Sequence, residues 1–257
     1  TRIMVKTNAS QLLREELSSP KWQPQTIAMS GVTDCYQPVE RKLKLTRSCL
    51  EVFAEFRNPV GIVTKNALVT RDLDLLTQLA RHNAVVVYVS VTTLDPDLRK
   101  IMEPRTSPPA ARLATIRKLS EAGVPVGVMV APVVPGLTDH EIPNIVAAAA
   151  EAGAKFAGTV TLRLPFAVAP LFEQWLTTHF PDRKEKVLAR LTSLRGGKLY
   201  DAQFGKRMTG EGIFAEQITQ LFTVACRRAG IADNHAHLSA ADFRRPGGTQ
   251  LGLFEVA

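Results

Sequence analysis

The stretch Val85-Val86-Val87-Tyr88-Val89-Ser90-Val91 decides the fold class. Valine favours extended backbone, and an unbroken apolar run of this length is typical of a parallel strand buried on both faces. Four other short stretches, each followed by a loop and a helical segment, repeat the pattern at residues 26–30, 60–64, 126–130 and 158–163. This alternation predicts an α/β fold with a parallel sheet.

The segments between the strands show helical periodicity and end at turn residues. We expect helices over 41–56, 70–82, 107–122 and 139–152, and a short helix opened by Asp95-Pro96. A further strand at 3–6 would bring the number of strands to about six. The pattern predicts a partial (β/α)6 TIM-like barrel, with a doubly wound open sheet as the alternative. No GxGxxG or GxxxxGK[ST] motif is present, which disfavours a dinucleotide or P-loop site.

The pattern changes after residue 165. Helical segments at 169–179, 182–194 and 211–228 have no clear strands between them. We therefore expect a barrel core over 1–165, a C-terminal helical extension over 166–232 and a flexible tail over 233–257, because the tail is polar and rich in glycine.

Composition indicates a globular protein, with 45% hydrophobic and 22% charged residues. No apolar run approaches the roughly 18 residues of a membrane helix, so no membrane partner is expected. Three cysteines are too few for a disulfide framework, which predicts a cytoplasmic location. The formal net charge of +8 favours a polyanionic partner such as nucleic acid.

Polar residues follow the predicted strands, and the carboxyl ends of parallel strands converge on one mouth. Lys65 suits a carboxylate or phosphate, or is a surface lysine on a turn. The hydroxyls of Ser90, Thr92 and Thr93 suit a sugar or amino-acid moiety, or bond to nearby backbone. The loop Gly31-Val32-Thr33-Asp34 offers a hydroxyl and a carboxylate to an ammonium group, or is a simple Asx turn.

Two further loops are candidates at the same mouth. Glu103 and Arg105 either pair, face solvent or reach a ligand across the barrel mouth. Pro132-Val133-Val134-Pro135-Gly136 is stiff and follows a strand, so it forms a wall against a flat ring or a rigid connector.

Metal-ligating residue types occur without a recognisable motif. His235 and His237 lie near Cys226 and Asp233, but their spacing matches no zinc signature. The three cysteines form no cluster motif, so we expect no metal ligand within this chain.

Several segments, taken in their order and spacing, resemble the radical S-adenosylmethionine (SAM) superfamily, and above all its bacterial spore-photolyase-like or DNA repair photolyase-like group. The similarity spans nearly the whole chain. The segments are Thr33-Asp34-Cys35-Tyr36-Gln37-Pro38-Val39-Glu40, Thr64-Lys65-Asn66, Arg71-Asp72-Leu73-Asp74-Leu75-Leu76, Ser90-Val91-Thr92-Thr93, Glu103-Pro104 with Arg112-Leu113, Val130-Ala131-Pro132 with Pro135-Gly136, and Phe204-Gly205-Lys206-Arg207-Met208-Thr209-Gly210.

The resemblance implies a partial barrel that holds SAM and a [4Fe–4S] cluster, reduced by an electron donor, and forms a 5′-deoxyadenosyl radical. It implies SAM contacts from Gly31, Thr33 and Asp34 at the amino group, from Lys65, Ser90 and Thr92 at the carboxylate or ribose, and from Val130 and Pro132 at the adenine. The CxxxCxxC cluster loop of the family does not occur here, so its cysteines are expected upstream of Thr1. Cys35, near the mouth, is either a hydrogen-atom donor or a small buried side chain.

Gln250-Leu251-Gly252-Leu253-Phe254 resembles the QLxLF peptide that docks bacterial DNA-maintenance proteins on the replication sliding clamp. In such a peptide Leu251, Leu253 and Phe254 would fill an apolar groove while Gln250 holds its polar edge. The sequence as a whole predicts a radical SAM enzyme, with DNA repair or nucleic-acid modification as its expected field of action. The alternatives are a catalytically silent barrel that binds nucleic acid or the clamp, and a cluster-free barrel enzyme acting on a small anionic metabolite.

Overall fold

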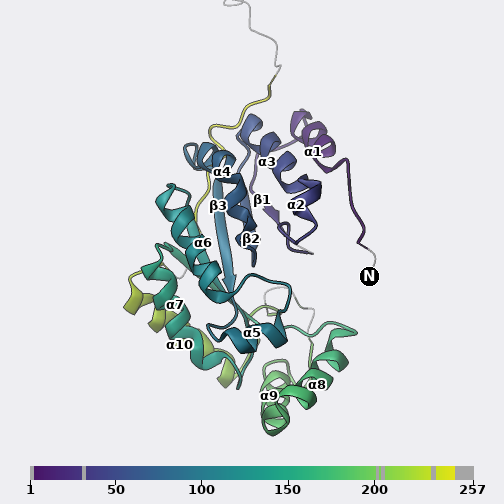
Figure 1. Ribbon diagram of the computed structural model, residues 1–257, viewed down its shortest axis with the longest axis vertical. Coiled ribbons are helices and arrows are strands. Elements are labelled where there is room, and N and C mark those ends of the chain that lie inside the picture. The colour runs from purple at the N-terminus through teal and green to yellow at the C-terminus, as the bar shows by residue number, and fades with distance from the viewer. Residues whose placement is uncertain (1–2, 31–32, 201–202, 204–205, 233–235, 247–257) are drawn as a thin grey trace, which may run out of the picture.

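A computed structural model describes residues 3–30, 33–200, 203, 206–232 and 236–246, and a five-stranded parallel sheet forms its centre (Figure 1). The strands are β1 (Ile27–Met29), β2 (Val60–Thr64), β3 (Val85–Val91), β4 (Val126–Val133) and β5 (Phe156–Thr161). They lie side by side in sequence order. Right-handed crossovers in one direction place the connecting helices on one face of the sheet. The fold is therefore an incomplete barrel, as predicted, and not a doubly wound sheet.

Ten α-helices are found in the described residues. They are α1 (Ala9–Ser18), α2 (Glu40–Leu43), α3 (Leu45–Phe56), α4 (Leu73–Ala80), α5 (Pro96–Met102), α6 (Pro109–Glu121), α7 (Ile142–Glu151), α8 (Val168–His179), α9 (Pro181–Ser193) and α10 (Ile213–Ala229). Short 3-10 turns, η1 (Ala67–Asp72) and η2 (Asp139–Glu141), precede α4 and α7. No helix in this part of the chain is long and apolar enough to cross a membrane.

Two local expectations are wrong. Residues 3–6 form no strand; Ile3, Met4 and Val5 are exposed, and among the described residues β1 pairs only with β2. Extended propensity alone does not make a strand where no neighbouring strand is available to share its hydrogen bonds. The helix expected over 41–56 is interrupted at Lys44, whose left-handed backbone (φ 52°) separates α2 from α3.

The two faces of the sheet differ in packing. Valines at alternate positions of β3 and β4, such as Val87 and Val128, lie in the main hydrophobic core beneath the helices. The opposite, inner face carries Tyr88, whose ring lies over Gly127. A Cβ at position 127 would lie 2.6 Å from that ring, so the close approach requires glycine.

The C-terminal helices divide between two cores. Buried side chains of α10, including Phe222 and Cys226, belong to the main core, and α10 packs against α7. Leu176 of α8 and Leu191 of α9 form a second core with Leu164. The helical extension expected from the sequence is thus a pair, α8 and α9, while α10 is a layer of the barrel.

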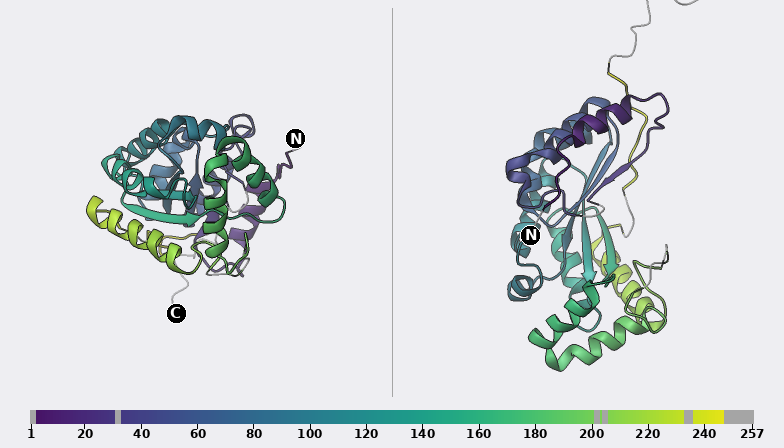
Figure 2. Two further views of the ribbon diagram at one scale, coloured as in Figure 1. Left: turned by 90° about the horizontal axis from the view of Figure 1, so that it is seen from below. Right: turned by 90° about the vertical axis from the view of Figure 1, so that its right-hand side faces the viewer.

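Residues 236–246, which we name the amino-edge strap, cross the amino ends of the strands. The Ser239 amide donates to the Asn83 carbonyl (2.9 Å), and the Arg244 amide donates to the Phe56 carbonyl (2.9 Å). Asn83 and Phe56 lie just before β3 and β2. In the right-hand view of Figure 2 this segment runs along the sheet toward the C-terminal ends of α1 and α3. Part of the tail expected to be flexible is therefore packed.

Candidate functional site

A cavity of about 440 Å³ opens at the carboxyl edge of the sheet, next to the end of β2. Its walls include Asp34 from the loop after β1, Lys65 and Asn66 from the end of β2, and Arg105 from the loop after α5. Its volume lies in the range of about 300–1,000 Å³ that small-molecule sites occupy. Residues far apart in the sequence thus converge at the mouth, as the strand pattern predicts.

The Asp34 carboxylate ties the loop after β1 to the end of β2. Its Oδ1 accepts hydrogen bonds from the Thr64 hydroxyl (2.8 Å) and the Tyr36 amide (2.8 Å). Its Oδ2 accepts from the Lys65 amide (2.7 Å). Three donors therefore hold Asp34 in place, so its clearest role is to fix the shape of the mouth around Lys65.

Lys65 belongs to a cluster of charges that extends from the mouth into the interior. Its Nζ contacts Glu103 and lies 3.4 Å from the Thr92 hydroxyl. The other oxygen of Glu103 accepts from Arg112 (2.7 Å), whose side chain is 1% exposed. Arg112 also donates to the Ser90 carbonyl at the end of β3 (2.9 Å). One carboxylate thus joins a half-exposed ammonium group to a fully buried guanidinium group.

Two opposing effects act on the pKa of Glu103. Burial raises it, because a charged carboxylate loses solvation, while Lys65 and then Arg112 lower it by charge attraction. The net result is a lowered pKa, so Glu103 is ionised at neutral pH. The cluster therefore carries one negative and two positive charges, and its excess positive charge lies where an anionic ligand group would enter.

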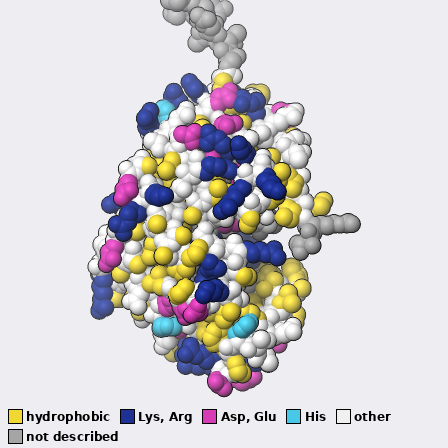
Figure 3. All heavy atoms as spheres, in the orientation of Figure 1, with side chains coloured by type: hydrophobic (Ala, Val, Ile, Leu, Met, Phe, Trp, Pro, Cys, Tyr) yellow, Lys and Arg dark blue, Asp and Glu magenta, His cyan; other side chains and the backbone are white. Residues whose placement is uncertain are grey.

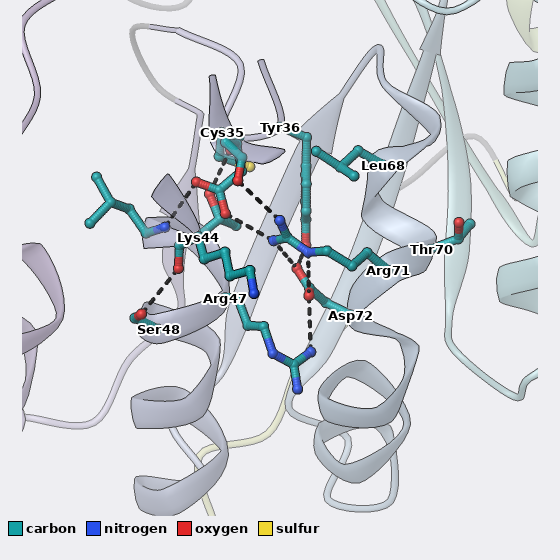
Figure 4. A network of polar contacts seen from close by, with 12 residues as sticks. Cys35, Tyr36, Lys44, Arg47, Ser48, Leu68, Thr70, Arg71 and Asp72 are labelled. Atoms are coloured by element: carbon teal, nitrogen blue, oxygen red, sulfur yellow. Dashed lines mark hydrogen bonds and ion pairs between the residues drawn. The ribbon is translucent and has the colours of Figure 1, made fainter. Parts of the chain in front are cut away.

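A second network supports the loop from beneath (Figure 4). Asp72 is fully buried and accepts from the Tyr36 hydroxyl (3.1 Å), from Arg47 (3.0 Å) and from Arg71 (2.8 Å). Arg71 also binds Glu40 (2.9 Å). These contacts join η1 and α3 to the segment 34–40, which keeps the loop rigid below the mouth.

Cys35 lies beside this network, partly buried. Burial raises the pKa of its thiol to about 12, against a smaller lowering effect of the Ser30 hydroxyl. The sulfur is therefore protonated at neutral pH. A neutral thiol retains the S–H bond that a hydrogen-atom donor needs and is a poor nucleophile or metal ligand.

The structure brings only some of the predicted residues together. Lys65, Thr92 and Asp34 lie around the mouth, and Ser90 is buried just below it. Thr33 is exposed beside Gln37, and Pro132 follows a cis peptide bond in the last part of β4. Gly31 and the tail residues lie outside the described residues; these tail residues are Gln250, Leu251, Leu253 and Phe254.

Val130 does not line the mouth with its side chain. It lies in the main core on the helix-covered face, because strand alternation turns it away from the inner face that carries Met129. Any contact of Val130 with a ligand would have to come from its backbone.

The sequence alone leaves the role of Glu103 open and does not point to Arg112. Both lie in a segment that carries the family resemblance, but nothing local shows that Glu103 pairs with Lys65, 38 residues earlier. The only sequence clue is that an arginine occupies a position of α6 otherwise expected to be apolar and buried.

The geometry first defines a class: an incomplete parallel α/β barrel with a charged ligand mouth at its carboxyl edge. The sequence profile of the Radical SAM superfamily matches residues 8–149, more than half of the chain, and the chain belongs to that superfamily.

Relatives and a solved structure agree with this assignment. An uncharacterized protein of Mycobacterium tuberculosis is 36% identical over 184 residues, covering 71% of this chain and 54% of that protein. An uncharacterized protein of Methanocaldococcus jannaschii is 30% identical over 139 residues, covering 54% of this chain and 50% of that protein. The chain thus spans about half the length of these relatives.

A mutant of spore photoproduct lyase, solved with the dinucleoside spore photoproduct, has a similar fold. The TM-score is 0.59 at 16% sequence identity, covering 88% of this chain and 65% of that chain. At this level of identity the likeness is evidence of a shared fold.

The superfamily implies two cofactors, SAM and a [4Fe–4S] cluster, and the residues fit them unequally. The cavity at Lys65 has the volume of a small-molecule site, with Lys65 and Arg105 as partners for the carboxylate of SAM's amino-acid part. In contrast, no group of three His, Cys, Asp or Glu side chains that could hold a metal is found in the described part of the chain. Residues that are described here do not form a cluster site.

Proposed function

We propose that this chain is the SAM-binding barrel of a radical SAM enzyme that acts on nucleic acid. The observation that supports the proposal is the convergence of Lys65, Arg105 and the Glu103–Arg112 pair at a cavity of suitable size. In this superfamily, SAM cleaved by one electron supplies a 5′-deoxyadenosyl radical that takes a hydrogen atom from the substrate. An electron donor, and cluster cysteines from outside the described residues, belong to the same proposal.

The roles of individual residues follow from their chemistry. Lys65 and Arg105 would bind the carboxylate of SAM by charge-assisted hydrogen bonds. The hydroxyls of Ser90 and Thr92 would meet the ribose or the amino-acid part, and Pro132 would lie against the adenine. Glu103 would hold Lys65 in position without touching SAM.

Nucleic acid as the substrate class is supported by charge. The chain carries 32 basic and 24 acidic residues. Such an excess favours phosphate backbones and gives binding that weakens with salt. The dinucleoside bound to the lyase mutant of similar fold supports the same class.

SAM binding tests the role of the mouth. Lys65→Ala should weaken SAM binding by about 10- to 100-fold, because one charge-assisted hydrogen bond is lost. Lys186→Ala, at an exposed position of α9, is the matched control and should bind as the unchanged chain does. Isothermal titration with SAM measures both; an unchanged affinity in Lys65→Ala would contradict the assignment.

Chemistry is tested on the protein as its gene encodes it. Anaerobic reconstitution with iron, sulfide and a reductant should yield 5′-deoxyadenosine from SAM. A reconstituted protein that holds no iron and yields no deoxyadenosine would favour a barrel that binds without catalysis and would refute the enzymatic proposal.

A further inference from the structure

An exposed phenylalanine lies in the loop between β5 and α8. Phe166 is 89% exposed, and its backbone is left-handed with φ 47°. Bulky residues rarely adopt this conformation, and such strain is retained where the surrounding structure has a use for it. The ring is not needed for folding, because α8 is anchored by Leu176 in the second core.

Phe166 is part of an aromatic and basic group. The Tyr200 ring lies 6.0 Å from the Phe166 ring, at an interplanar angle of 46°. The guanidinium carbon of Arg163 lies 5.9 Å from the centre of the Tyr200 ring. We name Arg163, Phe166 and Tyr200 the aromatic platform.

The cation of the platform has no acidic partner among the described residues. Within the described ranges no carboxylate pairs with Arg163, whose Nη1 contacts only the sulfur of Met208 at 3.8 Å. Lys198, two residues before Tyr200, is exposed and likewise has no acidic partner among the described residues. An exposed phenylalanine beside a partly buried tyrosine, with two cations that have no acidic partner in the described residues, is complementary to a base attached to a phosphate.

The platform is held on the carboxyl edge of the sheet, the same edge as Lys65. Arg163 lies two residues after the end of β5, and the Thr161 amide of β5 donates to the Met208 carbonyl (2.8 Å). Arg195 donates to the Leu162 carbonyl (2.6 Å), which fixes the end of α9 against the same strand. Figure 3 shows hydrophobic side chains in the hollow above α8 and α9, with Lys and Arg side chains at its rim.

We propose that the aromatic platform binds an unstacked nucleobase of single-stranded DNA, with Arg163 and Lys198 near the adjoining phosphates. Every base presents a π-face, so stacking on Phe166 and Tyr200 tolerates any sequence. This inference rests on the proposed function for the substrate class and adds the site at which that substrate is held. It predicts that the base, and not the phosphate chain alone, contributes to affinity.

Fluorescence anisotropy with two labelled probes tests the platform. One probe is oligothymidylate of about twelve nucleotides, within the site sizes known for stacking surfaces. The other has the same length and phosphates but abasic sugars. The chain should bind oligothymidylate more tightly, and Phe166→Ala and Tyr200→Ala should each weaken that binding roughly 5- to 100-fold.

The variants should affect the abasic probe much less, while Phe166→Trp should restore binding of oligothymidylate. Phe243→Ala is the matched control. The guanidinium carbon of Arg245 lies 5.2 Å from the centre of the Phe243 ring, so this phenylalanine also has a cation over its face, but it lies in the amino-edge strap. It should not change affinity for either probe. Thermal unfolding of each variant verifies that it is folded.

Equal binding of both probes by the unchanged chain would overturn the platform, as would unchanged affinity in a folded Phe166→Ala variant. The proposal would also be overturned if Phe166→Ala or Tyr200→Ala lost binding to anionic vesicles while binding to DNA stayed unchanged. That result would assign the patch to a membrane surface. These assays contain no SAM and the SAM titration contains no DNA, so failure of the platform and failure of the proposed function are separate results.

Discussion

The Glu103 carboxylate is shared between Lys65 at the mouth and Arg112 in the interior. Removing it by Glu103→Ala leaves the Arg112 guanidinium buried without a counter-charge. We expect a loss of about 3–5 kcal/mol in the free energy of unfolding, the usual cost of breaking a buried pair. Urea denaturation measures it, with Asp97→Ala as the control, because the Asp97–Lys100 pair is exposed and should contribute little.

Acid should remove the same stabilisation. The pKa of Glu103 is lowered in the folded state, so its contribution is complete above the ordinary glutamate value of about 4.3 and is lost as pH falls through the folded value. The difference in unfolding free energy between the unchanged protein and Glu103→Gln should shrink from neutral pH to pH of about 3. A difference that stays constant with pH would show that Glu103 is not ionised in the folded state.

Cys35 gives a prediction about reactivity. Because burial raises the pKa of its thiol to about 12, very little thiolate is present near pH 8. Iodoacetamide should label Cys35 far more slowly in the native protein than in urea, with peptide mass spectrometry separating it from Cys49 and Cys226. Rapid native labelling near pH 8 would indicate a lowered pKa and a thiolate role instead.

At the scale of elements, the inner face of the sheet depends on one close contact between β3 and β4. A Cβ at Gly127 would meet the Tyr88 ring at 2.6 Å and the Phe156 carbonyl oxygen at 2.9 Å. Gly127→Ala should therefore lower the unfolding free energy by about 1–3 kcal/mol through overpacking. Gly61→Ala on β2 is the control, since its nearest neighbour, Val86 Cγ1, is an ordinary 3.8 Å away.

The strands could largely be predicted because their signal is local. Val85–Val91 is apolar throughout and matches β3, while β4 extends to Val133, beyond the predicted end at 130, through a register shift against β5. The interruption at Lys44 was not predictable, because it depends on Glu40, which accepts from the Leu45 amide and binds Arg71. Such a break comes from tertiary contacts, which periodicity does not record.

At the scale of the whole molecule, the mouth could be predicted only in part. The rule that parallel strands end at one edge placed Asp34 and Lys65 together correctly. It could not show that Asp34 would be used to fix the loop, or that Val130 would face the core. Those outcomes depend on which donors and helices lie nearby, and the pairing of Lys65 with Glu103 joins two separate loops.

Clamp binding by residues 250–254 stays a prediction at this scale. Removing residues 250–257 should abolish association with a bacterial sliding clamp and leave SAM binding intact, because the cavity at Lys65 is lined by residues 3–106. Surface plasmon resonance with immobilised clamp measures the first and titration the second. Loss of SAM binding in the shortened chain would show that these residues support the fold.

The amino-edge strap ends on the side of the barrel opposite the mouth. Arg245 donates to the carbonyls of Ser19 (3.1 Å) and Trp22 (2.9 Å), at the end of the sheet opposite the mouth (Figure 1). Residue 246 therefore lies at the end of the barrel opposite the mouth. A fluorophore or affinity handle coupled there would leave the mouth unobstructed. A large partner bound at that end and another bound at the mouth would not compete for space.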